Sequence, residues 1–418
     1  MNEHFEEMLR RLKLTKPQRD DARTKYTTIA KLLHKDFYDT EYSGTTKLLI
    51  GSYGKHTNIR PPSDIDLLFK IPAEAYDQYQ DSPSALLQRV RKVIGAHYST
   101  TEKISAWGKV VLVKFPDGKH DVELLPAFEV GGVFMIPNTE EGGSWESFDA
   151  RADLNIVKDS DAATGGKTRP LIRIVKRWRK QTKTVTIKPF EIEKYSADFL
   201  QTYDYSSASW SSLVADFFTW LGDVAEKDAT QIQTAINRAK KAREFEADGK
   251  YKEACDEWRK VFGNRTFPAY SANLSKVVTL AKQFVAPAEQ HIEDMFPVRI
   301  DPAYSANIHS TVSGKGFRTH GVREFLARFP RFLKHMALTF SATTTVPGDV
   351  RIFWKVRNFG EEAQRLNQLR GEIEEGAGLS KRDENTLYLG DHYVECYVVK
   401  DGVCVARALQ FVPIGGEE

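Results

Sequence analysis

KLLIGSYGKHTNIRPPSDIDLLFKIP, residues 47–72, decides the fold of this chain. Its apolar run Leu48–Ile50 predicts a short buried strand, and Ile65–Phe69 predicts a second one. Between them, Gly51-Ser52 begins a turn, and two consecutive prolines keep the following segment irregular. Two buried strands joined in this way predict the sheet of a compact α/β unit.

Two acidic residues, Asp64 and Asp66, stand at the start of the second strand. Because residues i and i+2 of a strand share a face, their carboxylates would lie side by side. Two adjacent anions repel each other unless a cation lies between them. Hard oxygen ligands of this kind suit Mg²⁺ or Mn²⁺, so the pair predicts a metal site.

A third acidic position comes from HDVELLPAF (120–128), which follows the predicted strand KVVLVKF (109–115) after a turn at Asp117-Gly118. Asp121 and Glu123 are again two residues apart, so both side chains would point the same way. Phosphoryl transfer by two metal ions needs a further carboxylate from a neighbouring strand. Either acid could supply it, and both stay candidates.

The turn at Gly51-Ser52 fits the same chemistry. Glycine lets the backbone approach a phosphate closely, and the serine hydroxyl with nearby N–H groups can donate to phosphate oxygens. Each signal alone has an ordinary explanation, since D-x-D is often a solvated loop end and G-S a plain strand-to-helix turn. The combination of strand, G-S turn, D-x-D and acidic hairpin strand favours a phosphoryl-transfer site.

LIRIVKRWRK (171–180) predicts an amphipathic helix whose apolar face carries Leu171, Ile172, Val175 and Trp178. The opposite face carries a basic stripe of Arg169, Arg173, Lys176 and Lys180. The stripe is either a solvated helix face or a phosphate-binding surface.

The composition bounds the classes of protein that the chain can belong to. Its 418 residues are 41% hydrophobic, and its net charge is only +3, so overall charge gives no argument for nucleic-acid binding. Three sparse cysteines predict neither a disulfide framework nor a zinc site and fit a reducing cytoplasm. We expect neither a secretory signal nor a membrane span, because no apolar run is long enough.

Three regions with different patterns follow one another along the chain. We expect a catalytic core with an N-terminal helix over residues 1–185, a helical lobe over 186–295 and a β-rich, sandwich-like domain over 296–418. The fold class is therefore α+β. Asp248-Gly249 should break a helical hairpin, a further helix should run over roughly 271–293, and Asp401-Gly402 should form a tight hairpin.

Several other groups have weaker functional interpretations. The aromatic cluster Trp210, Phe217, Phe218 and Trp220 could stack on bases, but its helical spacing favours core packing. The basic run 238–243 has acids nearby, which favours a solvated helix face. Lys355 and Arg357 share one face of a predicted strand, which we expect to be solvated rather than phosphate-binding. Three C-terminal tyrosines, at 388, 393 and 397, are expected to be buried.

The motifs resemble those of a known family. Gly51-Ser52 with Asp64-x-Asp66 resembles the GS and DxD elements of the polymerase-β fold. The segment from Glu123 to Phe128 and the helix LIRIVKRW resemble elements of the oligoadenylate synthetase and bacterial cGAS/DncV-like branch. FWKVRNFGEEAQRLNQLRGEI (353–373) is similar to the adenylyl/guanylyl and SMODS C-terminal sensor domain, AGS-C.

The resemblance implies roles for individual residues. Asp64 and Asp66 would hold two Mg²⁺ or Mn²⁺ ions, with Glu123 as third ligand where the family has aspartate, and Asp121 as its competitor. Lys176 matches the lysine that binds the donor triphosphate. Phe190 matches an aromatic residue that stacks on a base, although Pro189 replaces the serine that usually precedes it.

The resemblance also implies a function: attack of a 2′- or 3′-hydroxyl on the α-phosphate of a nucleoside triphosphate, with release of pyrophosphate. The product would be a cyclic or linear nucleotide signal, made from NTPs or, as in Hailong-type systems, from dNTPs. In antiphage defence it would control an operon-encoded effector, often a membrane pore former, and nucleic acid could be product or activator. The alternatives are nucleotidyl transfer to a tRNA or protein, and a non-catalytic nucleotide-sensing regulator.

Overall fold

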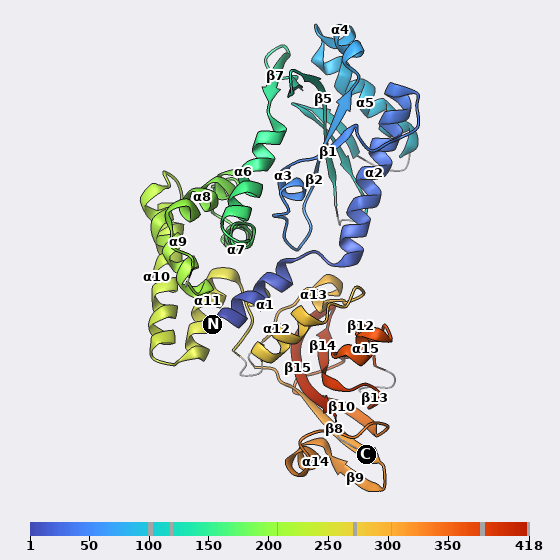
Figure 1. Cartoon of the computed structure of the whole chain (residues 1–418), viewed down its shortest axis with the longest axis vertical. Coiled ribbons are helices and arrows are strands. Elements are labelled where there is room, and N and C mark those ends of the chain that lie inside the picture. Colours follow the sequence, from blue (N-terminus) through green and yellow to red (C-terminus); the bar gives the residue numbers. More distant parts are fainter. Residues whose placement is uncertain are drawn as a thin grey trace. The chain divides into compact units, whose positions relative to one another are not determined.

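The computed structural model describes residues 1–98, 103–117, 120–206, 208–270, 274–301, 303–376 and 381–415. It divides into two compact units, Met1–Phe262 and Gly263–Glu418 (Figure 1). The expected boundaries at 185/186 and 295/296 stay predictions. The class is mixed α+β, which confirms the predicted fold class. In the part of the chain that the structure describes, no helix has the length and apolar character needed to cross a membrane.

The first unit is built on one sheet with the strand order β1-β2-β5-β4-β3, extended from β5 by β6 and β7. These strands are β1 Lys47–Leu49, β2 Ile65–Ile71, β3 Lys103–Trp107, β4 Val110–Lys114, β5 Val122–Val130, β6 Val133–Asn138 and β7 Ser144–Phe148. Strands β2 and β5 are parallel, and their register sets Asp66 opposite Glu123. The other pairings are antiparallel.

The two faces of this sheet have different neighbours. On one face, Leu67 of β2 and Leu124 of β5 pack with Ile29 of α2 (Lys16–Tyr38) and Val90 of α5 (Pro83–His97). On the other face, Leu68 packs near the start of α6 (Ala150–Ala163). Because side chains alternate along a strand, Asp66 shares the face of Leu68, away from α2 and α5. The sheet therefore presents its acids toward the side where α3 (Gly51–Gly54) and α6 lie (Figure 1).

The rest of the first unit is helical. It comprises α1 Asn2–Leu12, η1 Ala73–Ala75, α4 Tyr76–Tyr79, α7 Thr168–Gln181, α8 Pro189–Thr202, α9 Trp210–Val224, α10 Ala229–Ala247 and α11 Tyr251–Phe262. The predicted helical hairpin is confirmed, with its break between α10 and α11. Core packing of the aromatic cluster is confirmed for Trp210, Phe217 and Phe218, which are buried, while Trp220 is half-buried against Phe217. The basic run lies on α10 and has acidic partners, with Arg238 bound to Glu257.

The second unit is a sandwich of two four-stranded sheets, ordered β13-β10-β8-β9 and β12-β11-β14-β15 in the described residues. The strands are β8 Ala306–Gly314, β9 Phe317–Gly321, β10 Ala337–Thr344, β11 Arg351–Arg357, β12 Arg370–Glu375, β13 Lys381–Asn385, β14 Gly390–Lys400 and β15 Val403–Ile414. Its helices are α12 Leu274–Gln283, α13 Ile292–Met295, α14 Val322–Arg328 and α15 Glu361–Arg365. The core between the sheets includes Val312, Phe340, Trp354 and Val398.

Two expectations for this unit were wrong. The helix expected over 271–293 is shorter, because α12 ends at Gln283, and residues 271–273 lie outside the described part. Pro287 opposes continuation of the helix to residue 293, since the residue before a proline disfavours the helical conformation. The face of Lys355 and Arg357 is not solvated, because both side chains are buried.

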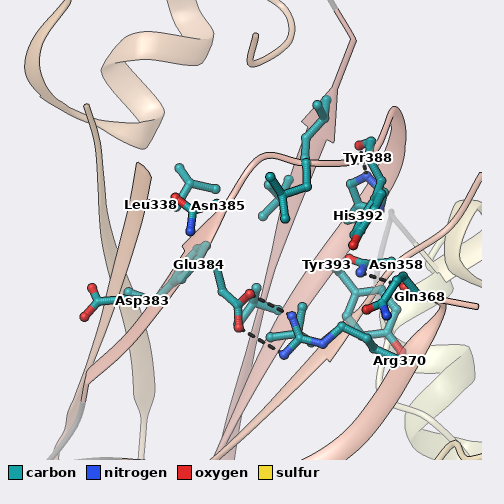
Figure 2. A pocket seen from close by; sticks show the side chains of 16 residues that line it. Leu338, Asn358, Gln368, Arg370, Asp383, Glu384, Asn385, Tyr388, His392 and Tyr393 are labelled. Carbon is teal, nitrogen blue, oxygen red and sulfur yellow. Dashed lines mark hydrogen bonds and ion pairs between the residues drawn. The ribbon is translucent and has the colours of Figure 1, made fainter. Parts of the chain in front are cut away.

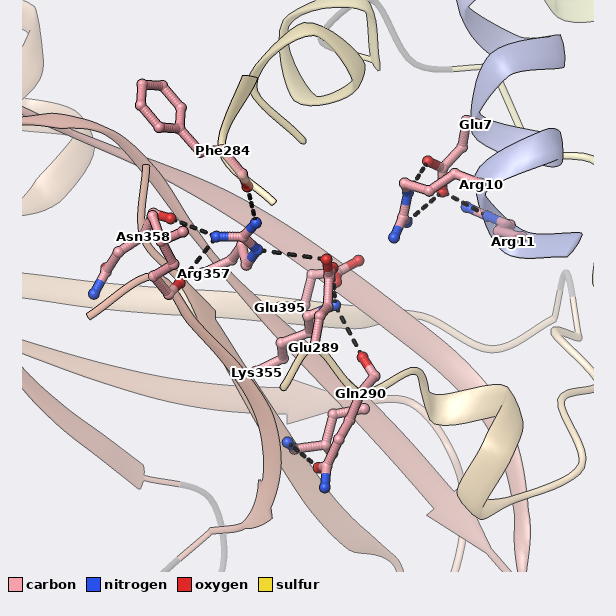
Figure 3. Close-up of polar contacts among 12 residues, drawn as sticks. Glu7, Arg10, Arg11, Phe284, Glu289, Gln290, Lys355, Arg357, Asn358 and Glu395 are labelled. Atoms are coloured by element: carbon pink, nitrogen blue, oxygen red, sulfur yellow. Dashed lines mark hydrogen bonds and ion pairs between the residues drawn. The ribbon is translucent and has the colours of Figure 1, made fainter. Parts of the chain in front are cut away.

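The segment that leads into the sandwich covers this face (Figure 3). Lys355 Nζ donates to Glu289 Oε1 at 2.7 Å, and Arg357 donates to the carbonyl oxygens of Phe284 and Leu369. Each cation therefore has protein partners, and the pair is structural rather than phosphate-binding. Of the three tyrosines, Tyr393 and Tyr397 are buried and Tyr388 is half-buried.

Candidate active site

The sequence-predicted residues meet around one pocket in the first unit, with a volume of about 630 Å³. This falls in the usual range for small-molecule sites, about 300–1,000 Å³. Its wall includes Gly51, Ser52, Asp64, Asp66, Glu123, Lys176 and Phe190, which are all the predicted site residues except Asp121. Lys55, Thr57, Asp153 and Glu193, which the sequence did not single out, also line it.

Gly51 has a role beyond the one predicted for it. Its φ is +54°, and a Cβ there would stand 2.0 Å from Asp66 Oδ2. The backbone of Ser52 donates a hydrogen bond to the Asp66 carboxylate. The glycine therefore lets the carboxylate, and not only a phosphate, approach the turn. Any side chain at residue 51 would displace Asp66.

Burial and neighbouring acids raise the pKa values of Asp66 and Glu123. Burial, followed by the charges of Glu123 and Asp64, raises the pKa of Asp66 to about 7. Burial raises the pKa of Glu123 as well, and Asp64 and Asp121 add to the effect. Carboxylates that crowd one another in this way are stabilised in their charged form only when a positive charge joins them.

The two candidates for the third acid differ in their surroundings. Asp121 precedes β5, and its Oδ1 accepts a hydrogen bond of 2.9 Å from the backbone N–H of Phe115, across the hairpin. Glu123 lines the pocket and stands opposite Asp66. These positions favour Glu123 as a metal ligand and give Asp121 a structural partner.

The donor set fits a hard divalent cation in its chemistry. Three carboxylates on the wall of one pocket supply only oxygen atoms, the ligands that Mg²⁺ and Mn²⁺ prefer. The geometry is not preassembled, because the described residues contain no group of three acidic, histidine or cysteine side chains disposed to hold a metal ion. Coordination would therefore require side chains of this set to move.

A buried charge network borders the acids. Lys176 Nζ donates to Glu193 Oε1 at 2.6 Å and to Thr57 Oγ1 at 2.8 Å. Lys55 Nζ donates to Glu193 Oε2 and to Asp153 Oδ1, each at 2.8 Å. Burial lowers the pKa of Lys176. Burial opposes the shift at Glu193, but the two lysines outweigh it and lower the pKa of that carboxyl. Glu193 thus holds both lysines at the pocket wall.

Sequence reasoning missed Lys55 and Glu193. Lys55 lies in an irregular loop and carries no local signal. Glu193 did carry one, since it shares a face of α8 with the buried Ser196, Ala197 and Leu200. An acid on the buried face of an amphipathic helix needs a cationic partner, which identifies it as a candidate for a buried ion pair.

The basic stripe of α7 forms hydrogen bonds to the loop that joins the Gly51-Ser52 turn to Asp64. Arg169 donates to the carbonyl oxygen of Lys55, Arg173 to that of His56 and Lys180 to that of Pro61. Lys176, the fourth member of the stripe, turns into the pocket. The stripe is therefore neither a plain solvated face nor a phosphate-binding surface along its whole length, and three of its residues position the loop.

Phe190 lies on the rim of the pocket and is 59% exposed. Its neighbour Pro189 is the first residue of α8, a position that proline favours because its missing N–H would have no helical partner there. The replacement of the family's serine thus suits the helix start. A large exposed aromatic ring at a pocket rim is available for stacking on a base.

Two family models match the chain. Residues 1–160 match the Second Messenger Oligonucleotide or Dinucleotide Synthetase domain, and residues 286–415 match the Adenylyl/Guanylyl and SMODS C-terminal sensor domain. A probable cyclic nucleotide synthase of Bacillus cereus is 23% identical over 287 residues, which are 55% of this chain and 84% of the relative.

Solved structures of bacterial enzymes are also similar. Escherichia coli CdnC with ATP has a TM-score of 0.47 and 20% identity, over 63% of this chain and 97% of that one. Vibrio cholerae DncV, a cyclic AMP-GMP synthase, in complex with a linear intermediate has a TM-score of 0.47 and 13% identity, over 65% of this chain and 89% of that one.

Proposed function

Because this chain belongs to the cGAS/DncV-like nucleotidyltransferases, we propose that it joins nucleoside triphosphates into a second messenger by the site described above. The observation that carries this proposal is the pairing of Asp66 with Glu123 across parallel strands, on the wall that also holds Ser52 and Lys176. Two crowded carboxylates cost stability when both are charged, and acids with pKa values perturbed in this way cluster at functional sites.

In this proposal, Asp64, Asp66 and Glu123 hold the Mg²⁺ or Mn²⁺ ions. When bound, such ions make the attacking hydroxyl more acidic and neutralise the leaving pyrophosphate. Asp66 takes part in its ionised form, opposite Glu123 on the neighbouring strand. The Ser52 hydroxyl orients the triphosphate. Phe190 stacks on the base of a bound nucleotide, which fixes the ring without selecting its identity.

Lys176 binds the triphosphate of the donor. It is buried and already paired with Glu193, so an arriving phosphate exchanges one anionic partner of the lysine for another. Because the lysine is held in place beforehand, little side-chain entropy is lost when the substrate binds. Positioning and charge complementarity of this kind supply most of the catalysis in phosphoryl transfer.

The product would control a partner effector in antiphage defence, and a membrane pore former is the kind of effector that we propose. Escherichia coli CdnC, one of the similar proteins, has been solved in complex with a HORMA protein, so protein partners are known for that enzyme. The product is cyclic or linear, and the substrates are NTPs or dNTPs.

A product assay tests the proposal. The purified protein is incubated with Mg²⁺ or Mn²⁺ and each NTP and dNTP radiolabelled at the α-phosphate, singly and mixed. We expect pyrophosphate release that the double variant Asp64→Ala, Asp66→Ala abolishes. Synthesis that persists in this variant would overturn the proposed site.

The form of the label distinguishes the products. A discrete phosphatase-resistant species indicates a cyclic signal, and a ladder indicates a linear one. Label that stays with a tRNA or protein indicates transfer to a macromolecule, and saturable nucleotide binding without turnover indicates a regulator.

A further inference from the structure

A second pocket lies within the C-terminal unit, at one end of its sandwich (Figure 2). Its volume is about 200 Å³. Its floor is made of side chains from the core between the two sheets, namely Leu338, Phe340, Val356, Val394, Val412 and Ile414. The sheets are therefore incompletely filled at this end, where β11, β12, β13 and β14 each begin or end.

The rim of this pocket is polar and offers hydrogen bonds. Asn358 is buried, and its Nδ2 donates to the carbonyl oxygen of Gln368 at 2.9 Å, which leaves its own Oδ1 available. The side-chain amides of Gln368 and Asn385 make no hydrogen bond to any described residue. Donors and acceptors thus stand together above an apolar floor, as in small-molecule sites generally.

The rim carries charged side chains that pair with their neighbours. Arg370 is the only cation among the described residues that line the pocket, and both of its terminal nitrogens bind Glu384, at 2.7 and 3.1 Å. Arg382, outside the lining, binds the same carboxylate at 2.7 Å. Asp383 adds a second carboxylate. Among the described residues of the lining, no cation is left over for a phosphate.

His392 is held in its neutral form. Its Nδ1 accepts from the backbone N–H of Phe359 at 3.0 Å, so its Nε2–H donates to the carbonyl oxygen of Tyr388 at 2.7 Å. Burial lowers its pKa, and Arg331 adds to this shift. The Tyr388 carbonyl, Asp391 and Glu362 oppose it. The wall is thus preorganised and uncharged at this point.

We propose that this pocket binds a neutral, flat heterocycle with hydrogen-bonding edges, of the size of a nucleobase, carried free or as an unphosphorylated nucleoside. The faces of the ring pack against the apolar floor, and the side-chain amides of the rim form hydrogen bonds to its edge. The pocket has about a third of the volume of the catalytic one, so it cannot enclose a dinucleotide or oligonucleotide product. This inference does not rest on the proposed function.

The test measures binding to the full chain by calorimetry. The probes are the free bases adenine, guanine, cytosine and uracil, their nucleosides, and the matching nucleoside monophosphates. The variant Asn385→Trp narrows the mouth at an exposed residue. Lys381→Trp is its control, because Lys381 is exposed on the same face of β13 but outside the lining. Phe190→Ala separates this site from the catalytic pocket.

We expect saturable one-to-one binding of at least one base or nucleoside, unchanged in Phe190→Ala and Lys381→Trp and weakened by about tenfold or more in Asn385→Trp. The matching monophosphate should bind this site at least about tenfold more weakly. Melting temperatures of the variants check that they are folded. The inference is overturned if no base or nucleoside binds up to its solubility limit, if binding survives Asn385→Trp unchanged, or if monophosphates bind more tightly than nucleosides.

Discussion

Lys176 Nζ lies 2.6 Å from Glu193 Oε1, and both side chains are buried. The lysine that matches the family's triphosphate-binding position is therefore paired with a carboxylate of its own chain. Glu193 also binds Lys55 at 2.8 Å, and Asp153 is a second carboxylate partner of Lys55. In the proposed function, a triphosphate competes with Glu193 for these lysines, because it brings several negative charges to the same wall.

Glu193→Gln should lower the free energy of unfolding by about 3–5 kcal/mol, because it leaves two buried lysines short of a negative charge. Asp198→Asn is the matched control, since Asp198 is exposed on the same helix, and it should change stability by less than about 0.5 kcal/mol. ATP should restore part of the lost melting temperature of Glu193→Gln, since phosphate supplies the missing charge. Chemical denaturation measures both changes, and equal stability of the two variants would contradict the prediction.

Glu123→Gln should reduce turnover by about 10²-fold or more. The substitution removes the negative charge that lies across from Asp66 and that we propose holds the metal ions. Asp121→Asn should cost less than about tenfold, because the remaining oxygen still accepts from Phe115. Pyrophosphate release at saturating Mg²⁺ measures both. A larger loss in Asp121→Asn than in Glu123→Gln would make Asp121 the third acid.

Much of the fold could be predicted because the local periodicity of apolar residues indicates its helices and strands. The helix predicted over 171–180 lies inside α7, and Ile65–Phe69 lies inside β2. Burial that depends on distant segments could not be predicted in this way. Lys355 alternates with apolar neighbours as a half-solvated strand would, and only Glu289, 66 residues earlier in the chain, shows that the face is covered.

The candidate site follows the same division. The acids and the G-S turn are close in sequence or carry a motif, so they could be identified. The network of Lys55 and Glu193 joins residues 138 apart, and no local pattern pairs them. The basic stripe of α7 was identified, but its targets are backbone carbonyls of a loop, which have no sequence signature.

Glu289→Ala should destabilise the C-terminal unit by about 3–5 kcal/mol, because Lys355 would stay buried without its carboxylate partner. Glu372→Ala is the control, since Glu372 is an exposed acid on β12 of the same unit. Differential scanning calorimetry of the full chain measures the loss. If the two variants melt alike, the ion pair contributes little and the covering segment is held by its apolar contacts.

The metal-free protein should lose stability as the pH rises from about 4 to about 7, through the titration of Asp66. Burial, with Glu123 and Asp64, raises the pKa of this carboxyl from 3.8 to about 7, so the folded state binds the proton more tightly than the unfolded chain does. Stability therefore falls with rising pH within that window and changes no further above it.

Because other groups titrate there too, the measurement is the difference in melting temperature between the wild type and Asp66→Asn across pH 4–8 in EDTA. The wild type should fall relative to the variant, and Mg²⁺ at pH 8 should stabilise the wild type alone, since the cation offsets the charge that the site carries once Asp66 is ionised. Parallel curves for the two proteins in EDTA would show that Asp66 titrates at its ordinary value.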